Sequence, residues 1–146
     1  MRRCLVDTSV FVYALGGEHP LRKPCKQVVR SLGGGEVAGE VSADLLQELA
    51  HQRHRRTGDR AGAAAAAREA AQICPIHDVT GEDALRALGL FERHARLDAR
   101  DAVFAAVAIG RGIDAILSSD RAFDGIDGLD RVDPADVQAV RALAGA

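Results

Sequence analysis

The segment that decides the fold spans residues 4–15 and reads CLVDTSVFVYAL. Its first three residues form a short apolar run, which favours a buried strand. Asp7, Thr8 and Ser9 are residue types that commonly cap helices, and the apolar residues from Val10 to Leu15 continue until two glycines. The segment therefore predicts a buried strand that leads directly into a short helix.

The rest of the chain repeats this alternation. Strand patterns are expected at 36–41, 75–79, 115–117 and 129–132, and helical patterns at 21–32, 42–56, 61–74, 83–97, 98–109 and from Pro134 onward. Thr80 and Asp83 form a capping box before the fourth of these helices, and 102–109 is apolar on every face, as in a central buried helix. Parallel strands need helical crossovers and are buried on both faces. The pattern predicts an α/β fold with a central, mainly parallel sheet, formed by residues 1–146 as a single domain.

Composition fits an ordinary globular protein and narrows the location. The chain has 146 residues, 47% of them hydrophobic and 27% charged, with a net charge of −2 and a pI near 6.2. No global positive field would attract nucleic acid, so any such binding needs a local basic patch. Cys4, Cys25 and Cys74 are odd in number and beside apolar residues, which favours buried thiols in a reducing compartment. No signal-like or membrane-spanning stretch is apparent, so we expect a cytoplasmic protein without membrane contact.

Four acidic residues stand where an α/β fold collects functional groups. Asp7 and Asp120 each follow an apolar strand, and functional groups gather at the carboxyl ends of parallel strands. Asp101 begins the apolar helix, and Glu48 lies on the helix predicted over 42–56.

Each acid also has a purely structural interpretation. Asp7 and Asp120 could cap the elements that follow them, Asp98 and Asp101 match a helix-start pattern, and Glu48 could be a solvated surface residue. We assign Asp98 to capping and leave Asp101 evenly divided between the two interpretations.

Taken together, the acids predict a metal site. Several carboxylates in one cleft repel one another unless protons or cations neutralise them. Oxygen ligands without histidine or thiolate favour Mg²⁺ or Mn²⁺, and such ions suit phosphodiester hydrolysis.

Four sequence blocks resemble PIN-domain ribonucleases, and in particular the VapC-type toxins of type II toxin–antitoxin pairs. Residues 6–14, VDTSVFVYA, resemble the opening motif of PIN domains, although asparagine is common where this chain has Ser9. Residues 45–49, LLQEL, and 97–106, LDARDAVFAA, resemble the second and third acidic motifs, and 116–124, ILSSDRAFD, is similar to the closing motif of VapC-type toxins. With the residues that follow, the likeness runs from about Val6 to Pro134.

The resemblance implies a three-layer α/β/α PIN-like fold and a metal-dependent endoribonuclease that uses metal-activated water. The implied metal-binding catalytic acids are Asp7, Glu48, Asp101 and Asp120. The implied supporting groups are Ser9, Ser118, Asp98 and Asp124. The resemblance also implies a homodimer and inhibition by a cognate VapB-type antitoxin whose tail covers the acidic cleft.

A basic stretch follows Glu48 on the same helix and includes Arg53, Arg55 and Arg56. It could be a solvated helix end in which cations complement the helix dipole. Phosphate binding, however, needs local cations, and arginine forms bidentate phosphate contacts. We therefore select these three arginines as RNA-binding candidates.

Other functions have less support in the sequence. A phosphoacceptor signalling domain is also an α/β sheet with an aspartate at a strand end, but it typically has a lysine near the site, and the only lysines here are Lys23 and Lys26 in an early helix. A catalytically silent PIN-like binding module is a second alternative, although such a scaffold would have lost acids that this chain retains. His51, His54, Cys74 and His77 lack the paired spacing of a zinc site.

Overall fold

In the computed structural model, which describes residues 1–145, five strands form one sheet in the order β3-β2-β1-β4-β5. Every strand pairing in that sheet is parallel, as the sequence predicts. The strands are β1 (Arg3–Val6), β2 (Ala38–Ser42), β3 (Ile76–His77), β4 (Ala115–Leu117) and β5 (Asp130–Val132). The order reverses at β1, because β2 lies on one side of β1 and β4 lies on the other.

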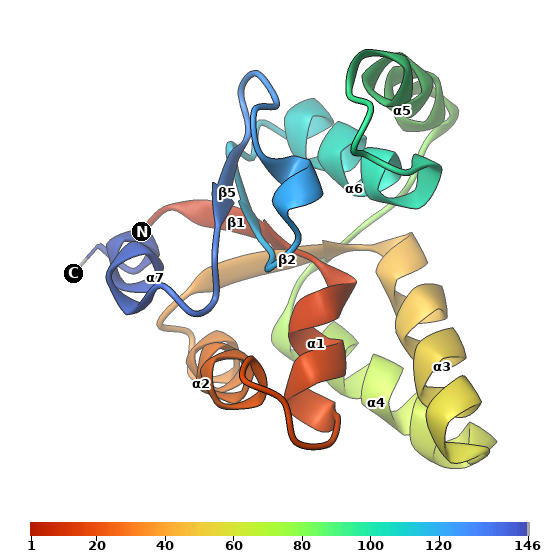
Figure 1. The fold of residues 1–146 in the computed structure, drawn as a ribbon, viewed down its shortest axis with the longest axis vertical. Helices are drawn as coiled ribbons and strands as arrows, with labels where there is room; N and C mark the ends of the chain where they lie inside the picture. Colours follow the sequence, from red (N-terminus) through yellow and green to blue (C-terminus); the bar gives the residue numbers. More distant parts are fainter. Residues whose placement is uncertain (146) are drawn as a thin grey trace.

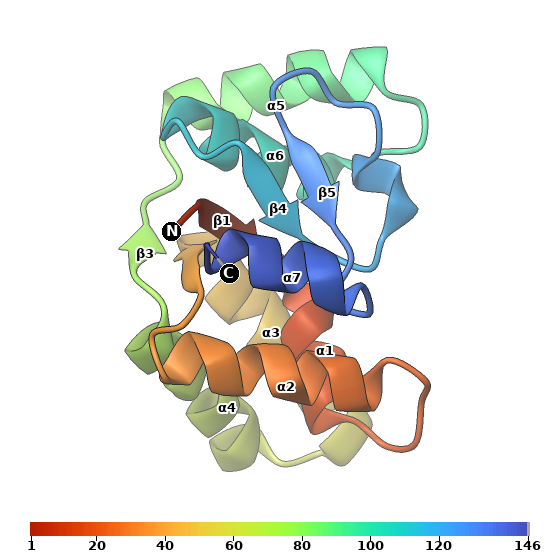
Figure 2. The same ribbon diagram turned by 90° about the vertical axis from the view of Figure 1, so that its left-hand side faces the viewer.

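Helices cover both faces of the sheet and complete the predicted three layers. The helices are α1 (Thr8–Leu15), α2 (Arg22–Gly33), α3 (Ala43–Thr57), α4 (Arg60–Ile73), α5 (Gly81–Arg93), α6 (Ala99–Gly110), the 3₁₀ helix η1 (Arg121–Phe123) and α7 (Val137–Leu143). α5 and α6 lie on one face, and α1 to α4 with α7 lie on the other (Figures 1 and 2). Among the described residues, none of the helices is long and apolar enough to cross a membrane.

The core is aliphatic and centres on α6. Six residues of α6 are fully buried, as predicted from a segment that is apolar on every face: Ala102, Phe104, Ala105, Ala106, Val107 and Ala108. Val103 and Ile109 are partly buried. β1 and β4 pack beneath this helix with no exposure of Leu5 or Ile116. Cys4, Cys25 and Cys74 are buried free thiols, which agrees with the sequence prediction.

Several element boundaries differ from the sequence prediction. α5 ends at Arg93 rather than near Leu97, although the apolar spacing continues to this buried loop residue. The last helix begins at Val137 rather than Pro134, because Asp136 caps it by accepting a hydrogen bond from the Ala139 N–H. The alternating pattern of residues 36–41 predicts a half-exposed strand, but β2 is buried because it lies between β1 and β3. β3 has only two residues.

Candidate active site

Asp7 lies at the point where the strand order of the sheet reverses. It follows β1, and its backbone N–H donates to the carbonyl oxygen of Leu117, the last residue of β4, at 3.0 Å. In open parallel sheets, ligands bind outside the carboxyl ends of the strands at such a reversal. The strand order therefore places Asp7 at the position where this fold class builds its sites.

The Asp7 side chain is buried, with 5% of the residue exposed, and two hydroxyl groups hold it. Ser9 Oγ and Ser118 Oγ each donate to Asp7 Oδ2 at 2.7 Å. Burial raises the pKa of Asp7; the two hydroxyl hydrogen bonds oppose this rise, and the charge of Asp120 adds to it. Although Asp7 is the N-cap residue of α1, its side chain makes no capping hydrogen bond, so the capping interpretation is wrong for this residue.

Glu48 reaches the same region from α3. Its side chain is only 16% exposed, so it is not the solvated surface residue of the alternative interpretation. Thr8 Oγ1 donates to Glu48 Oε2 at 3.3 Å, and Gln52 Nε2 donates to Oε1 at 3.2 Å. Burial raises the pKa of Glu48, the Arg100 charge lowers it, and the Asp7 charge raises it again. The effect of Asp7 on this pKa indicates that the two carboxylates share one electrostatic environment.

Asp98 and Asp101 at the start of α6 play different parts. Asp98 caps the helix, because its Oδ1 accepts a hydrogen bond from the Asp101 N–H at 2.8 Å, as the sequence predicts. No reciprocal bond from the Asp101 side chain is formed among residues 1–145. The pKa of Asp101 is raised to about 8, first by burial and then by the charges of Asp7, Asp98, Asp120 and Glu48. Asp101 is therefore the residue whose pKa is raised by the charges of all the other candidate metal-binding acids.

Asp120 and Asp124 follow β4, and both have structural partners. Asp120 Oδ1 accepts from the Ala122 N–H at 2.9 Å and caps η1, while its charge still raises the pKa of Asp7 and of Asp101. The capped-turn interpretation of Asp120 is thus correct. Asp120 nevertheless remains a candidate metal ligand, because its charge affects Asp7 and Asp101. Asp124 instead pairs with Arg131, with Nε and Oδ1 2.6 Å apart.

The four acids influence one another's charge but do not form a finished metal cage. In the part of the chain that the structure describes, no three His, Cys, Asp or Glu side chains are grouped so that they could hold a metal ion. The donor chemistry nevertheless fits Mg²⁺ or Mn²⁺, because the groups are all oxygen donors, and burial followed by the charges of neighbouring acids raises the pKa of Asp7 and Asp101. Mg²⁺ usually keeps several waters and needs only one or two carboxylates.

The predicted basic stretch lies at the far end of α3 from Glu48. α3 ends at Thr57, and Gly58 adopts a φ of 68° as the C-cap, so Arg55 and Arg56 occupy the last turn, where cations complement the helix dipole. Arg53 Nη1 donates to the Leu15 carbonyl oxygen at 3.2 Å. The helix-end interpretation thus describes these arginines as they stand, and their contact with RNA stays a prediction.

Sequence reasoning missed residues that contact the acids, among them Thr8 and Arg100. Thr8 is 2% exposed and orients Glu48, although the sequence suggested only a cap at this position. Arg100 Nη1 lies 3.8 Å from Glu48 Oε1, and Arg100 Nη2 lies 3.9 Å from Asp98 Oδ2. The sequence position of Arg100, between Asp98 and Asp101 at the start of a predicted helix, could have indicated this role. A cation flanked by two acids is a candidate partner for both.

The fold and the cleft define an α/β protein with an acidic site at the reversal point of a parallel sheet. The family model described as PIN domain matches residues 4–129, and the chain belongs to this family. Ribonuclease VapC7 from Mycobacterium tuberculosis is 42% identical over 124 residues, which cover 82% of this chain and 83% of the relative.

Two solved structures share the fold. The crystal structure of Mycobacterium tuberculosis VapC20, described as a Sarcin-Ricin loop cleaving toxin, is 27% identical with a TM-score of 0.65, and the match covers 86% of this chain and 92% of that chain. A toxin-antitoxin complex from Klebsiella pneumoniae is 19% identical with a TM-score of 0.66, and the match covers 90% of this chain and 97% of that one. The second likeness concerns the fold alone.

Proposed function

We propose that this protein is an endoribonuclease toxin that hydrolyses RNA phosphodiester bonds with a divalent metal ion. The observation that carries the proposal is the buried Asp7 carboxylate, which two serines orient at the reversal point of the sheet and whose charge is felt by Glu48 and Asp101. The 42% identity to a protein named a ribonuclease supports the same reaction for this chain.

Asp7, Glu48, Asp101 and Asp120 are the residues that would hold Mg²⁺ or Mn²⁺. A bound ion of this kind lowers the pKa of water and polarises a phosphate oxygen. Asp98 and Asp124 are weaker candidates, because one caps α6 and the other pairs with Arg131.

The other cleft residues orient the acids and receive the substrate. Ser9 and Ser118 fix the Asp7 carboxylate, and Thr8 with Gln52 fixes Glu48. The Arg100 side chain is 70% exposed and only 3.8 Å from Glu48, so it can move from that carboxylate to an incoming phosphate. Arg53, Arg55 and Arg56 extend the cationic surface along α3 for the flanking RNA.

The same assignment includes control by a VapB-type antitoxin that covers the acidic cleft. The likeness to VapC20, which is described as a toxin, supports the toxin role, and a solved structure of the same fold is described as a toxin-antitoxin complex. The buried free cysteines are consistent with a reducing, cytoplasmic setting.

We further propose a homodimer formed through α5. Leu85, Leu88 and Phe91 recur every three residues on this helix and are 72%, 57% and 47% exposed. A contiguous exposed apolar stripe of this kind is typical of interaction surfaces. Leu88→Glu is expected to shift the sedimentation profile to monomer, whereas Val137→Glu, at a site of the same 57% exposure on α7, is not. Equal profiles for both variants would remove α5 from the interface.

The proposed reaction is tested by incubating the purified protein with a mixed RNA pool in magnesium or manganese, with a chelated control. Asp7→Asn and Glu48→Gln should abolish cleavage. Asp127→Asn and Glu69→Gln, which make the same chemical changes at exposed positions outside the cleft, should retain it. Cleavage that persists in Asp7→Asn or in chelator would identify a contaminating nuclease and contradict the assignment.

A further inference from the structure

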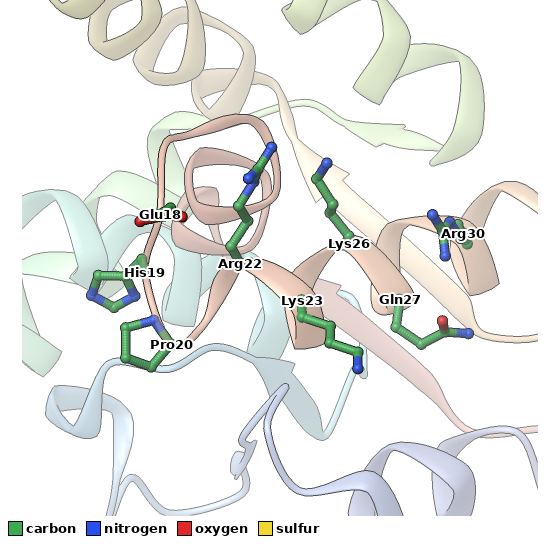
Figure 3. Close-up of a pocket in the computed structure, with 8 residues that line it drawn as sticks. All are labelled: Glu18, His19, Pro20, Arg22, Lys23, Lys26, Gln27 and Arg30. Carbon is green, nitrogen blue, oxygen red and sulfur yellow. The ribbon is translucent and has the colours of Figure 1, made fainter.

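The outer face of α2 carries a row of cations over an open hollow. Arg22, Lys26 and Arg30 recur every four residues and so lie on one side of the helix, about 6 Å apart along its axis. Lys23 points toward the opposite side of α2 from Arg22 and Lys26 (Figure 3). These four cations line a hollow of about 760 Å³ together with Glu18, its only acid, and with His19, Pro20 and Gln27.

This arrangement carries an energetic cost that the protein does not offset. Like charges four residues apart on a helix are destabilising by a few tenths of a kcal/mol per pair, about 0.2–0.5. None of the four cations forms an ion pair with any residue in 1–145. The buried Nε of Arg22 also lacks a hydrogen-bond partner within the described chain. The row therefore has no acidic partner among the described residues, and its charges are available to a ligand.

The cation row is continuous with the basic end of α3. Arg56 lines a smaller hollow with Gly16, Glu18 and His19, and the last two also line the hollow over α2. The His19 ring stacks on Tyr13, with ring centroids 4.4 Å apart, which fixes the loop between α1 and α2 across this junction. The two hollows therefore adjoin at Glu18 and His19, between Arg56 on α3 and the row on α2.

The row also lies on the side of the molecule where the sheet strands end. In Figure 2 the tips of β4 and β5 and the N-terminal end of α2 point to the same side. A flexible chain bound at the acids that follow these strands can therefore extend toward the N-terminal end of α2.

We propose that the row Arg22, Lys26 and Arg30 binds the sugar–phosphate backbone of single-stranded RNA that extends beyond the cleft. The inference rests on the proposed function and adds a second contact region for its substrate. Regularly spaced cations suit a polymer with one charge per nucleotide. An acidic protein segment would also need apolar anchors, and Pro20 is the only apolar residue that lines the hollow.

The test compares two double variants that each remove two positive charges. Lys26→Gln with Arg30→Gln changes the row, and Arg68→Gln with Arg93→Gln changes exposed arginines on α4 and α5. Binding to a long single-stranded RNA is measured in chelator at several salt concentrations. The row variant should reduce the slope of log K against log salt by about 1.4, at about 0.7 per phosphate contact, and the control should leave it unchanged. Equal slopes for the two double variants and the wild type would overturn the proposal.

A second measurement separates this inference from the proposed function. With magnesium present, a short RNA that fills only the cleft should be cleaved equally by the wild type and the row variant, whereas a long RNA should have a higher KM with the row variant alone. If the wild type cleaves neither RNA, the proposed function is wrong. The salt slopes still show whether the row binds RNA. If the row variant is impaired equally on short and long RNA, the row does not bind flanking nucleotides.

Discussion

Replacing Asp101 with asparagine should make the protein more stable at neutral pH and inactive. The pKa of Asp101 is raised from 3.8 to about 8, first by burial and then by the neighbouring acids. The folded state therefore holds a proton that the unfolded state releases, so stability decreases as the pH rises from about 4 to about 8. Asparagine is neutral throughout this range and removes the dependence.

The magnitude follows from the shift. At 1.36 kcal/mol per pKa unit, the full difference between wild type and Asp101→Asn at pH 8 is about 5 kcal/mol. The side chain is only partly buried, and solvent screening with relaxation of the other acids reduces this figure to about 2 kcal/mol. Well below pH 4, Asp101 is protonated in both the folded and the unfolded wild type. The wild type and Asp101→Asn should then have nearly equal stability.

Urea unfolding at pH 4, 6 and 8 in chelator measures the effect, with Asp127→Asn as the control for an exposed aspartate. The difference in unfolding free energy between wild type and Asp101→Asn should grow with pH, and that between wild type and the control should not. Added magnesium should raise the stability of the wild type at pH 8 more than that of Asp101→Asn. If Asp101→Asn has the same stability as the wild type at pH 8, the charge repulsion inferred for the cleft is wrong.

Three further changes test other contacts. Ser118→Ala removes one of the hydrogen bonds that orient the buried Asp7 carboxylate and should lower activity about 10–100-fold with little change in fold, as measured by cleavage rate and circular dichroism. Arg100→Ala should lower kcat/KM by about tenfold or more by removing a phosphate contact, and Arg100→Lys should restore part of it. Asp83→Asn breaks the ion pair with Arg111 and should lower the free energy of unfolding by about 2 kcal/mol at pH 7, as measured by urea unfolding. Because the pKa of Asp83 is lowered to about 2, the difference in stability from the wild type should disappear as the pH falls from 4 to 2.

Local sequence signals identified the elements better than their ends. The Thr80–Asp83 capping box forms with both of its hydrogen bonds, because a cap depends only on residues within one turn. The end of α5 was misplaced because no glycine or proline marks it and the buried Leu97 continues the apolar spacing beyond the helix. The burial of β2 depends on its neighbours β1 and β3, which are remote in sequence and leave no local signal.

The candidate site was predictable as a set of residues but not as an arrangement. The positions of Asp7 and Asp120 after apolar strands were sufficient to place them at one edge of a parallel sheet. The sequence did not reveal that Ser9 and Ser118 both bind the same oxygen of Asp7, or that Arg100 faces Glu48, because these contacts depend on the adjacency of β1 and β4 and on the packing of separate helices.

Two buried aspartates show how the protein separates structural from functional charge. Asp83 is 1% exposed and has Arg111 and Thr80 as partners, so its pKa is lowered to about 2 and its charge stabilises the fold. Asp7 is 5% exposed, yet within residues 1–145 only hydroxyl and backbone groups bind its carboxylate, and its pKa is raised. Burying a carboxylate without a cation is costly, and that cost persists in a protein when function requires the group. The contrast favours Asp7 as the acid whose compensating positive charge comes from a bound ion.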